Sequence, residues 1–213
     1  MTHMTKFRES LAVFMRRPLM GLCLLMIFFM VPVPQADAGA ALDTIQKQIN
    51  SLLDVLRDPS FKALPTEKEK TDKIWPLVDE IFDYTALSKR ALSRNWKKLN
   101  KEQRKEFTAL FSKVLGNIYM GRLLKYTDEK VVFGKEKMLS ETKAEVETNI
   151  ITASAEIPIN YRLRLKKGEW RVYDVAVEGI SMVKNYRSQF QQILSKKSPE
   201  ELLEMLRKKV SEI

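Results

Sequence analysis

The segment over residues 170–190 constrains the fold more than any other part of the chain. It reads W-R-V-Y-D-V-A-V-E-G-I-S-M-V-K-N-Y-R-S-Q-F. Aromatic and β-branched residues dominate its first half and suit a pleated, half-buried surface, so this half predicts a strand. Glu178-Gly179 then interrupts the pattern with a glycine that can adopt positive φ, and Ser181 can cap a helix. The segment therefore predicts a strand that leads directly into a helix folded back over its sheet.

A period of two predicts the remaining strands. Residues 144–152 and 157–165 alternate between apolar and polar side chains, residues 131–133 form a short apolar run, and Lys167-Gly168 is typical of a hairpin turn before the strand at 170–177. Because each long strand has one polar and one apolar face, we expect an antiparallel sheet that helices cover on one side.

Helical spacing of apolar residues accounts for the rest of the chain. The predicted helices cover residues 42–56, a stretch beginning at Thr66 that Pro76 should kink or restart, residues 85–96, residues 101–125, a stretch beginning at Ser181 and a stretch beginning at Ser198. No internal linker or repeat separates these elements. The pattern predicts a single α+β domain over residues 39–213.

The first 38 residues have the pattern of a cleaved secretory signal. A basic front precedes an apolar run at 19–31, and Ala36-Asp37-Ala38 offers a small-x-small cleavage site. As a helix, this run would reach only roughly 20 Å, against about 30 Å of membrane hydrocarbon. We therefore favour export by the Sec route, with an uncleaved anchor as the alternative.

Removal of this signal limits the available chemistry. The only cysteine, Cys23, and the only histidine, His3, both lie within it. The mature chain would have no thiolate or imidazole for a nucleophile, a metal site or a disulfide. We therefore expect no metal and no cofactor.

The charge balance suggests an anionic partner. The formal net charge is +10, but export argues against nucleic acid. Anionic lipid headgroups or acidic protein surfaces suit a basic exported protein better, and a solvated basic face with no specific partner is the alternative.

Several blocks of this sequence resemble one family. The block at 170–190 does so, as do Phe82-Asp83, Arg90-Ala91-Leu92, Trp96 and the run from 103 to 107 that leads to Phe111 and Tyr119. These blocks resemble the MlaC family of periplasmic phospholipid carriers, also called toluene-tolerance auxiliary proteins. The resemblance implies an NTF2-like curved antiparallel sheet, with several helices around an apolar cavity.

The resemblance also implies a function. Members of this family carry lipid without changing it chemically, between an inner-membrane MCE-type ABC transporter and an outer-membrane lipoprotein complex. The chain has no phosphate-loop motif, so any energy would come from a partner. We expect a periplasmic, monomeric, non-catalytic phospholipid carrier. Two alternatives remain: a carrier of hopanoid, as in a sister group of the family, or of another hydrophobic small molecule, and a non-catalytic interaction protein with a filled core.

Apolar side chains on the long helix and on the strands are the candidates for a lipid-binding cavity. They are Phe107, Phe111, Val114, Ile118, Val146, Ile150, Ile157, Ile159, Tyr161, Tyr173, Val175 and Val177. Ordinary core packing is the alternative for each, because sequence does not separate a cavity lining from a core.

Three polar candidates complete the list. Lys184 and Arg187 lie one turn apart on a predicted helix and could meet a lipid phosphate or an acidic partner, although we favour a solvated helix face for each. Asp174 follows Tyr173, but neighbouring strand residues point to opposite faces. We therefore expect Tyr173 in the core and Asp174 paired with an arginine or a backbone amide, rather than a catalytic pair.

Overall fold

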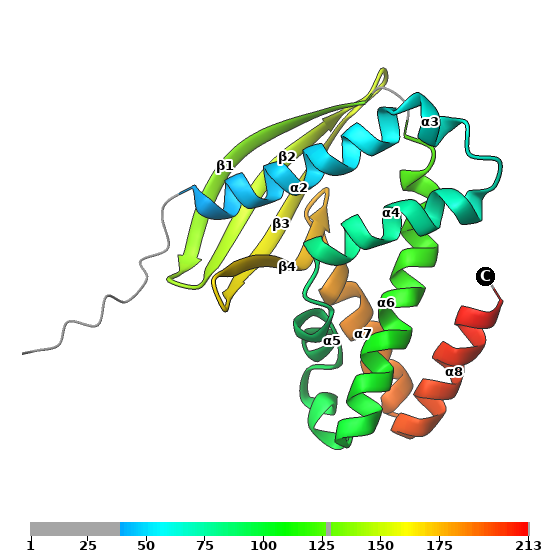
Figure 1. Ribbon diagram of the computed structural model, residues 1–213. Helices are drawn as coiled ribbons and strands as arrows, with labels where there is room; N and C mark the ends of the chain where they lie inside the picture. Colours follow the sequence, from blue (N-terminus) through cyan, green and yellow to red (C-terminus); the bar gives the residue numbers. More distant parts are fainter. Residues whose placement is uncertain (1–38, 127–128, 213) are drawn as a thin grey trace, which may run out of the picture. The chain divides into compact units, whose positions relative to one another are not determined.

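The computed structural model describes residues 39–126 and 129–212 (Figure 1). The predicted secretory signal, including its cleavage site, lies outside these residues. Within them, helices come first, a five-stranded sheet follows, and two helices complete the chain. This order agrees with the α+β prediction.

The sheet is an antiparallel meander in which each strand pairs with the next along the chain. Its strands are β1 (Lys130–Ser140), β2 (Lys143–Ile151), β3 (Glu156–Lys166), β4 (Glu169–Val177) and β5 (Ile180–Ser181). Positive φ angles occur at Lys167 and Gly168 (54° and 84°) and again at Glu178 and Gly179 (50° and 79°). Two successive residues with positive φ match the twist of a tight hairpin, so both predicted turns are confirmed.

Strand β1 is much longer than the predicted 131–133 segment. Its pairing with β2 shifts between Phe133 and Glu136, and beyond this irregularity Glu136 lies opposite Val146 on the apolar side of the sheet. There its carboxylate accepts hydrogen bonds from the backbone N–H groups of Gly39 and Leu42 at 3.1 and 2.8 Å. Glu136 places a charge on the apolar face and so interrupts the alternation of apolar and polar residues. For this reason the sequence pattern did not predict the second half of β1.

The described part of the chain also contains seven α-helices and one 3₁₀ helix. They are α2 (Ala40–Arg57), α3 (Pro59–Lys62), α4 (Glu67–Ile81), α5 (Tyr84–Leu92), the 3₁₀ helix η1 (Ser93–Lys98), α6 (Lys101–Leu123), α7 (Met182–Leu194) and α8 (Pro199–Ser211). The sequence predicts a kink or a restart at Pro76, and helix α4 runs through Pro76 without a restart. The predicted helix at 85–96 is divided, because Ser93 has a positive φ of 52° where α5 ends.

The apolar side chains form two clusters. The first lies between the sheet and helices α2 and α4, with Met120 from the end of α6. The second lies among α5, α6, α7 and α8, away from the sheet. Helix α6 contributes to both, so it is the long element that connects the sheet region to the helical region (Figure 1).

Two buried carboxylates fasten the helical region to the strands. Asp174 of β4 accepts hydrogen bonds from Ser181 Oγ at 2.6 Å and from the backbone N–H of Val183 at 3.0 Å, at the start of α7. Asp83 caps α5 by accepting from the backbone N–H of Ala86 at 2.9 Å, and its other carboxylate oxygen lies 3.6 Å from Arg164 Nε on β3. Anions are favourable at helix N-termini, so these contacts stabilise the helices and also position them against the sheet.

Candidate functional site

The apolar face of the sheet is the first candidate site. In the pairing register, Ile150 lies opposite Ile157, and Val146 lies opposite Tyr161. Residues that lie directly opposite in an antiparallel pair project to the same face. This face therefore contains Ala144, Val146, Thr148, Ile150, Ile157, Ile159, Tyr161, Leu163, Leu165, Trp170, Val172, Val175 and Val177.

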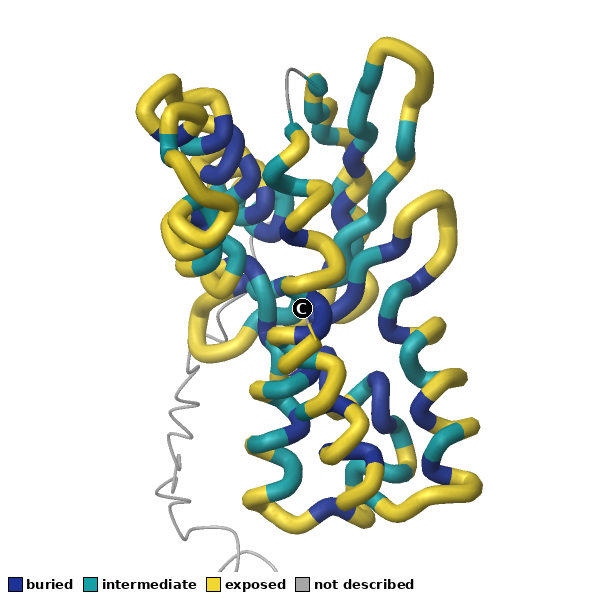
Figure 2. Tube along the Cα trace, turned by 90° about the vertical axis from the view of Figure 1, so that its right-hand side faces the viewer, coloured by how far each residue is buried: buried dark blue, intermediate teal, exposed yellow. Residues whose placement is uncertain are grey.

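Burial changes along this face. Ala144, Leu163 and Val172 are fully buried where helices cover the sheet. Toward the β2–β3 hairpin, Ile150 and Ile157 are only half-buried, and the strands in Figure 2 change from buried to intermediate in this direction. We call this half-buried apolar region, made of Ile150, Ile157, Ile159, Tyr161, Val175 and Val177, the open end of the sheet.

A polar pair, Thr148 and Tyr161, lies at the border between the buried part of this face and the open end of the sheet. Thr148 is buried, and its hydroxyl donates to the carbonyl oxygen of Ile159 at 3.2 Å. Burial raises the pKa of Tyr161 from 10.0 to about 12, and a hydrogen bond with Thr148 partly offsets this rise. The phenol is therefore neutral at physiological pH, and it places a hydroxyl among apolar side chains.

The predicted helical residues do not join this face. Phe107, Phe111 and Val114 belong to the second cluster. The rings of Phe107 and Phe111 lie 5.4 and 5.1 Å from the ring of Phe190 on α7. Their side chains are packed inside the helical region. Their role in binding lipid remains a prediction. Ile118, one turn further along α6, is 38% exposed.

Tyr173 also lies apart from the other strand candidates. It occupies the irregularity where the β3–β4 register shifts, and it belongs to neither cluster. The guanidinium carbon of Arg90 lies 3.8 Å from the centre of its ring, a cation–π contact. Asp174 binds Ser181 and Val183, and one of its oxygens lies 3.6 Å from Arg162 Nη1. The prediction of a paired Asp174 is confirmed.

The two predicted cationic contacts differ from each other. Arg187 is half-buried, and its Nε donates to the carbonyl oxygen of Arg90 at 2.9 Å, where α5 leaves its last carbonyl groups without helical partners. Lys184 is exposed. Arg187 therefore joins α7 to α5, while Lys184 projects into solvent from the first turn of α7.

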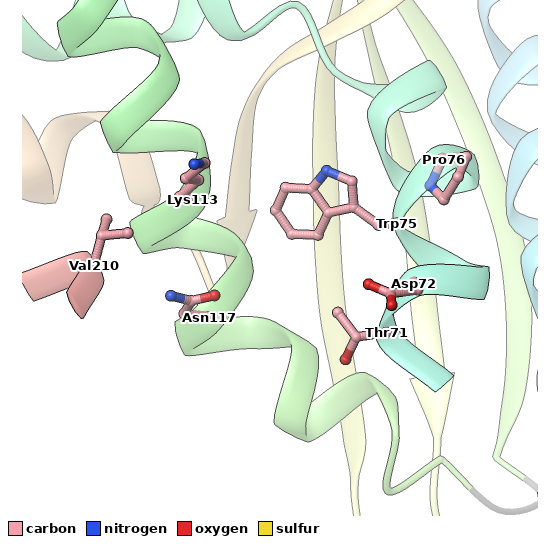
Figure 3. A pocket seen from close by; sticks show the side chains of 7 residues that line it. All are labelled: Thr71, Asp72, Trp75, Pro76, Lys113, Asn117 and Val210. Atoms are coloured by element: carbon pink, nitrogen blue, oxygen red, sulfur yellow. The ribbon is translucent and has the colours of Figure 1, made fainter. Parts of the chain in front are cut away.

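Sequence reasoning missed a groove between α4 and α6. It has a volume of about 350 Å³, and Figure 3 shows the Trp75 ring extending from α4 toward α6 beside Asn117. The other lining residues are Thr71, Asp72, Pro76, Lys113 and Val210. A Cβ atom at Gly116 would lie only 1.9 Å from the Trp75 ring. An isolated glycine inside a helical pattern was the available signal for this close approach.

Two further observations concern the described residues only. None of their helices is both long enough and apolar enough to cross a bilayer. Residues 39–126 and 129–212 also contain no group of three or more histidine, cysteine or acidic side chains with the arrangement of a metal site.

The fold and its apolar face define a class of protein. A curved antiparallel sheet with helices over one face is the α+β, NTF2-like arrangement (Figure 1). The sequence profile described as MlaC protein matches residues 46–208. The chain belongs to the MlaC family.

Individual relatives agree with this assignment. The chain is 28% identical to the "Intermembrane phospholipid transport system binding protein MlaC" of Haemophilus influenzae over 128 residues, 58% of this chain and 60% of that protein. It is 25% identical to the "Toluene tolerance protein ttg2D" of Pseudomonas putida over 172 residues, 80% of this chain and 79% of that protein.

A solved structure shares the fold. The phospholipid-binding protein from Ralstonia solanacearum, determined in complex with a phospholipid, superposes with a TM-score of 0.71 at 21% sequence identity. The superposition covers 81% of this chain and 97% of that one.

Proposed function

We propose that this chain is a periplasmic carrier that holds the acyl tails of a phospholipid at the open end of the sheet and leaves the headgroup in water. The carrier exchanges lipid between an outer-membrane lipoprotein complex and an inner-membrane MCE-type ABC transporter. It performs no chemistry on its cargo, and its partners supply the energy.

The half-buried apolar residues of the open end are the observation that carries this proposal. Val177 is 41% exposed, and Ile150, Ile157 and Ile159 are half-buried beside it in the sheet register. Apolar surface that a protein leaves uncovered in one continuous region commonly marks a binding site. The names of the relatives support phospholipid as the occupant.

A soluble carrier lowers the cost of moving a phospholipid through water. A two-tailed phospholipid exposes about 30 methylenes, and each costs roughly 0.8 kcal/mol to hold in water. Escape of a lipid from a bilayer is therefore slow, and a soluble protein accelerates transfer only if it offers comparable apolar surface. Tails of this size need a pocket of about 1,000 Å³, so we expect the helices to move apart from the open end when lipid binds.

Mass spectrometry of the protein purified from the periplasm without detergent tests the proposal. We expect a stoichiometric adduct with the mass of a phospholipid, both in the intact complex and after organic extraction. A hopanoid mass would instead assign the chain to the sister group. A homogeneous lipid-free protein would indicate a filled core and an interaction protein.

A pair of matched variants locates the site. Val177→Glu places a carboxylate on the apolar face, whereas Val132→Glu places one on the opposite face, where Val132 pairs with Asn149 and is 38% exposed. We expect the adduct to disappear in Val177→Glu and to persist in Val132→Glu. Equal lipid content in both folded variants would place the site elsewhere.

A further inference from the structure

One end of the helical region is strongly basic. Residues 89–105 contain eight basic residues and one acidic residue. Six of the basic side chains are exposed and form what we call the basic end: Lys89, Arg94, Lys97, Lys98, Lys101 and Lys105. They come from α5, η1 and the first turns of α6, which lie at the end of the unit away from the β2–β3 hairpin (Figure 1).

The charge of this end is not neutralised within the described structure. None of the six side chains forms an ion pair among residues 39–126 and 129–212. The nearby carboxylates of Glu106, Glu200 and Glu204 all bind Arg207, at 2.7, 3.0 and 2.8 Å. These three carboxylates are therefore already paired with Arg207 and do not neutralise the basic end.

The other two cations of the segment are used differently. Arg90 lies over the Tyr173 ring, and Arg104 Nε donates to the carbonyl oxygen of Trp96 at 2.9 Å. Both arginines thus have partners within the protein, while five of the six free cations are lysines. The sequence places directional guanidinium groups in internal contacts and compact ammonium charges on the surface.

We propose that the basic end docks this protein on the surface of an anionic lipid bilayer. Protein interfaces are depleted in lysine and enriched in aromatic residues and arginine, which is the opposite of this surface. A dense group of lysines suits the diffuse negative field of anionic headgroups, where each basic residue near the surface contributes to attraction. Charge complementarity therefore selects a bilayer over a protein partner.

The apolar residues of the same segment indicate how the contact is made. Leu92 and Leu99 are buried, and no large apolar side chain of residues 89–105 is exposed. With nothing to insert into the hydrocarbon, the docking is electrostatic, reversible and sensitive to salt. The open end of the sheet, at the other end of the unit, stays accessible while the protein is docked (Figure 1).

Co-sedimentation with vesicles tests this inference, using protein purified from the periplasm. The probes are vesicles of phosphatidylcholine alone and vesicles of phosphatidylcholine mixed with phosphatidylglycerol. The docking variant combines Lys97→Glu, Lys98→Glu and Lys101→Glu. The matched control combines Lys62→Glu, Lys135→Glu and Lys137→Glu, three exposed lysines outside the segment, so the net charge changes equally.

We expect binding of the unaltered protein to anionic vesicles at low salt, and none to neutral vesicles. The docking variant should lose about 100-fold or more in partition coefficient, and the control should lose less than about tenfold. Equal losses in the two variants would overturn the inference, because net charge alone would explain them. Failure of the unaltered protein to bind anionic vesicles would also overturn the inference. So would co-purification of an acidic protein with the unaltered protein but not with the docking variant, because the basic end would then bind a protein.

This inference does not rest on the proposed function. Surface docking requires no occupied apolar site, so Val177→Glu should still bind anionic vesicles after losing its lipid adduct. The two proposals can therefore fail separately.

Discussion

Gly116 is a position where α6 accepts no side chain. An added Cβ would lie 1.9 and 2.0 Å from two carbon atoms of the Trp75 ring, so the ring or the helix would have to move. Overpacking of this kind typically costs 1–3 kcal/mol. We expect Gly116→Ala to lower the free energy of unfolding by about 1 to 3 kcal/mol, as measured by urea denaturation.

Gly121 is the matched control on the same helix. Apart from its chain neighbours and the adjacent backbone of α6, no atom lies within 4 Å of a Cβ built there, and glycine is intrinsically unfavourable within a helix. Gly121→Ala should therefore leave the stability unchanged or raise it by up to about 1 kcal/mol. If both substitutions had the same effect, the contact with Trp75 would not be the reason that Gly116 is glycine.

Tyr161 should make stability depend on pH in the alkaline range. Its pKa is raised to about 12 in the folded protein, from 10.0, so the folded state holds the phenolic proton more tightly than the unfolded state does. Stability from this group is fully present below pH 10 and is lost as the pH rises from about 10 to about 12. The loss is roughly 2 to 3 kcal/mol.

The variant Tyr161→Phe isolates this contribution. Denaturant unfolding at intervals between pH 8 and pH 12 should show a smaller decline for the variant than for the unaltered protein. Parallel declines would mean that Tyr161 does not titrate differently in the folded and unfolded states.

At the scale of elements, the sequence predicted most helices and the strands β2, β3 and β4, because their apolar periods and caps are local. Ser181 caps its helix in the predicted way, because its side chain accepts a hydrogen bond from the backbone N–H of Lys184. The failures occurred where tertiary contacts override the pattern. Glu136 points to the apolar side of β1 because it binds the start of α2, and no local signal reveals that distant partner.

Asp174 shows how one side chain connects elements. It joins the start of α7 to β4 and lies beside Arg162 of β3. We expect Asp174→Asn to cost about 1 to 3 kcal/mol, because the buried anionic cap of α7 is lost and half-buried Arg162 keeps only Glu145 as a counter-charge. Urea denaturation gives the total cost, and amide hydrogen exchange should show the first turn of α7 opening more often.

An exposed acid provides the comparison for Asp174. Glu169 lies 3.0 Å from Arg171 on the surface, where ion pairs contribute little. Glu169→Gln should change stability by less than about 0.5 kcal/mol. Similar costs for the two substitutions would indicate that burial and capping give Asp174 no special role.

At the scale of the whole molecule, the division into two apolar clusters was not predictable from sequence. The strand candidates Ile150 and Ile159 and the helix candidates Phe107 and Phe111 have equally apolar patterns. Only the three-dimensional arrangement separates a half-buried sheet face from a packed helical core. The sequence could therefore predict which side chains are apolar and inward-facing, but not which of them are left partly uncovered.

This division predicts that the two clusters serve different purposes. Phe111 is fully buried among the rings of Phe107, Tyr186 and Phe190, so Phe111→Ala should cost about 3 to 5 kcal/mol. Lipid bound per folded molecule should stay unchanged. Ile159→Ala, at the half-buried open end, should cost less than about 1.5 kcal/mol and should reduce the bound lipid.

Two measurements on each variant separate these effects. Denaturant unfolding of delipidated protein gives the stability, and mass spectrometry of the folded fraction gives the lipid content. Because each variant is compared by both measurements, a general loss of folding cannot imitate a loss of binding. If Phe111→Ala emptied the folded protein of lipid while Ile159→Ala kept it, the acyl tails would lie within the helical cluster, and the open end would be ordinary surface.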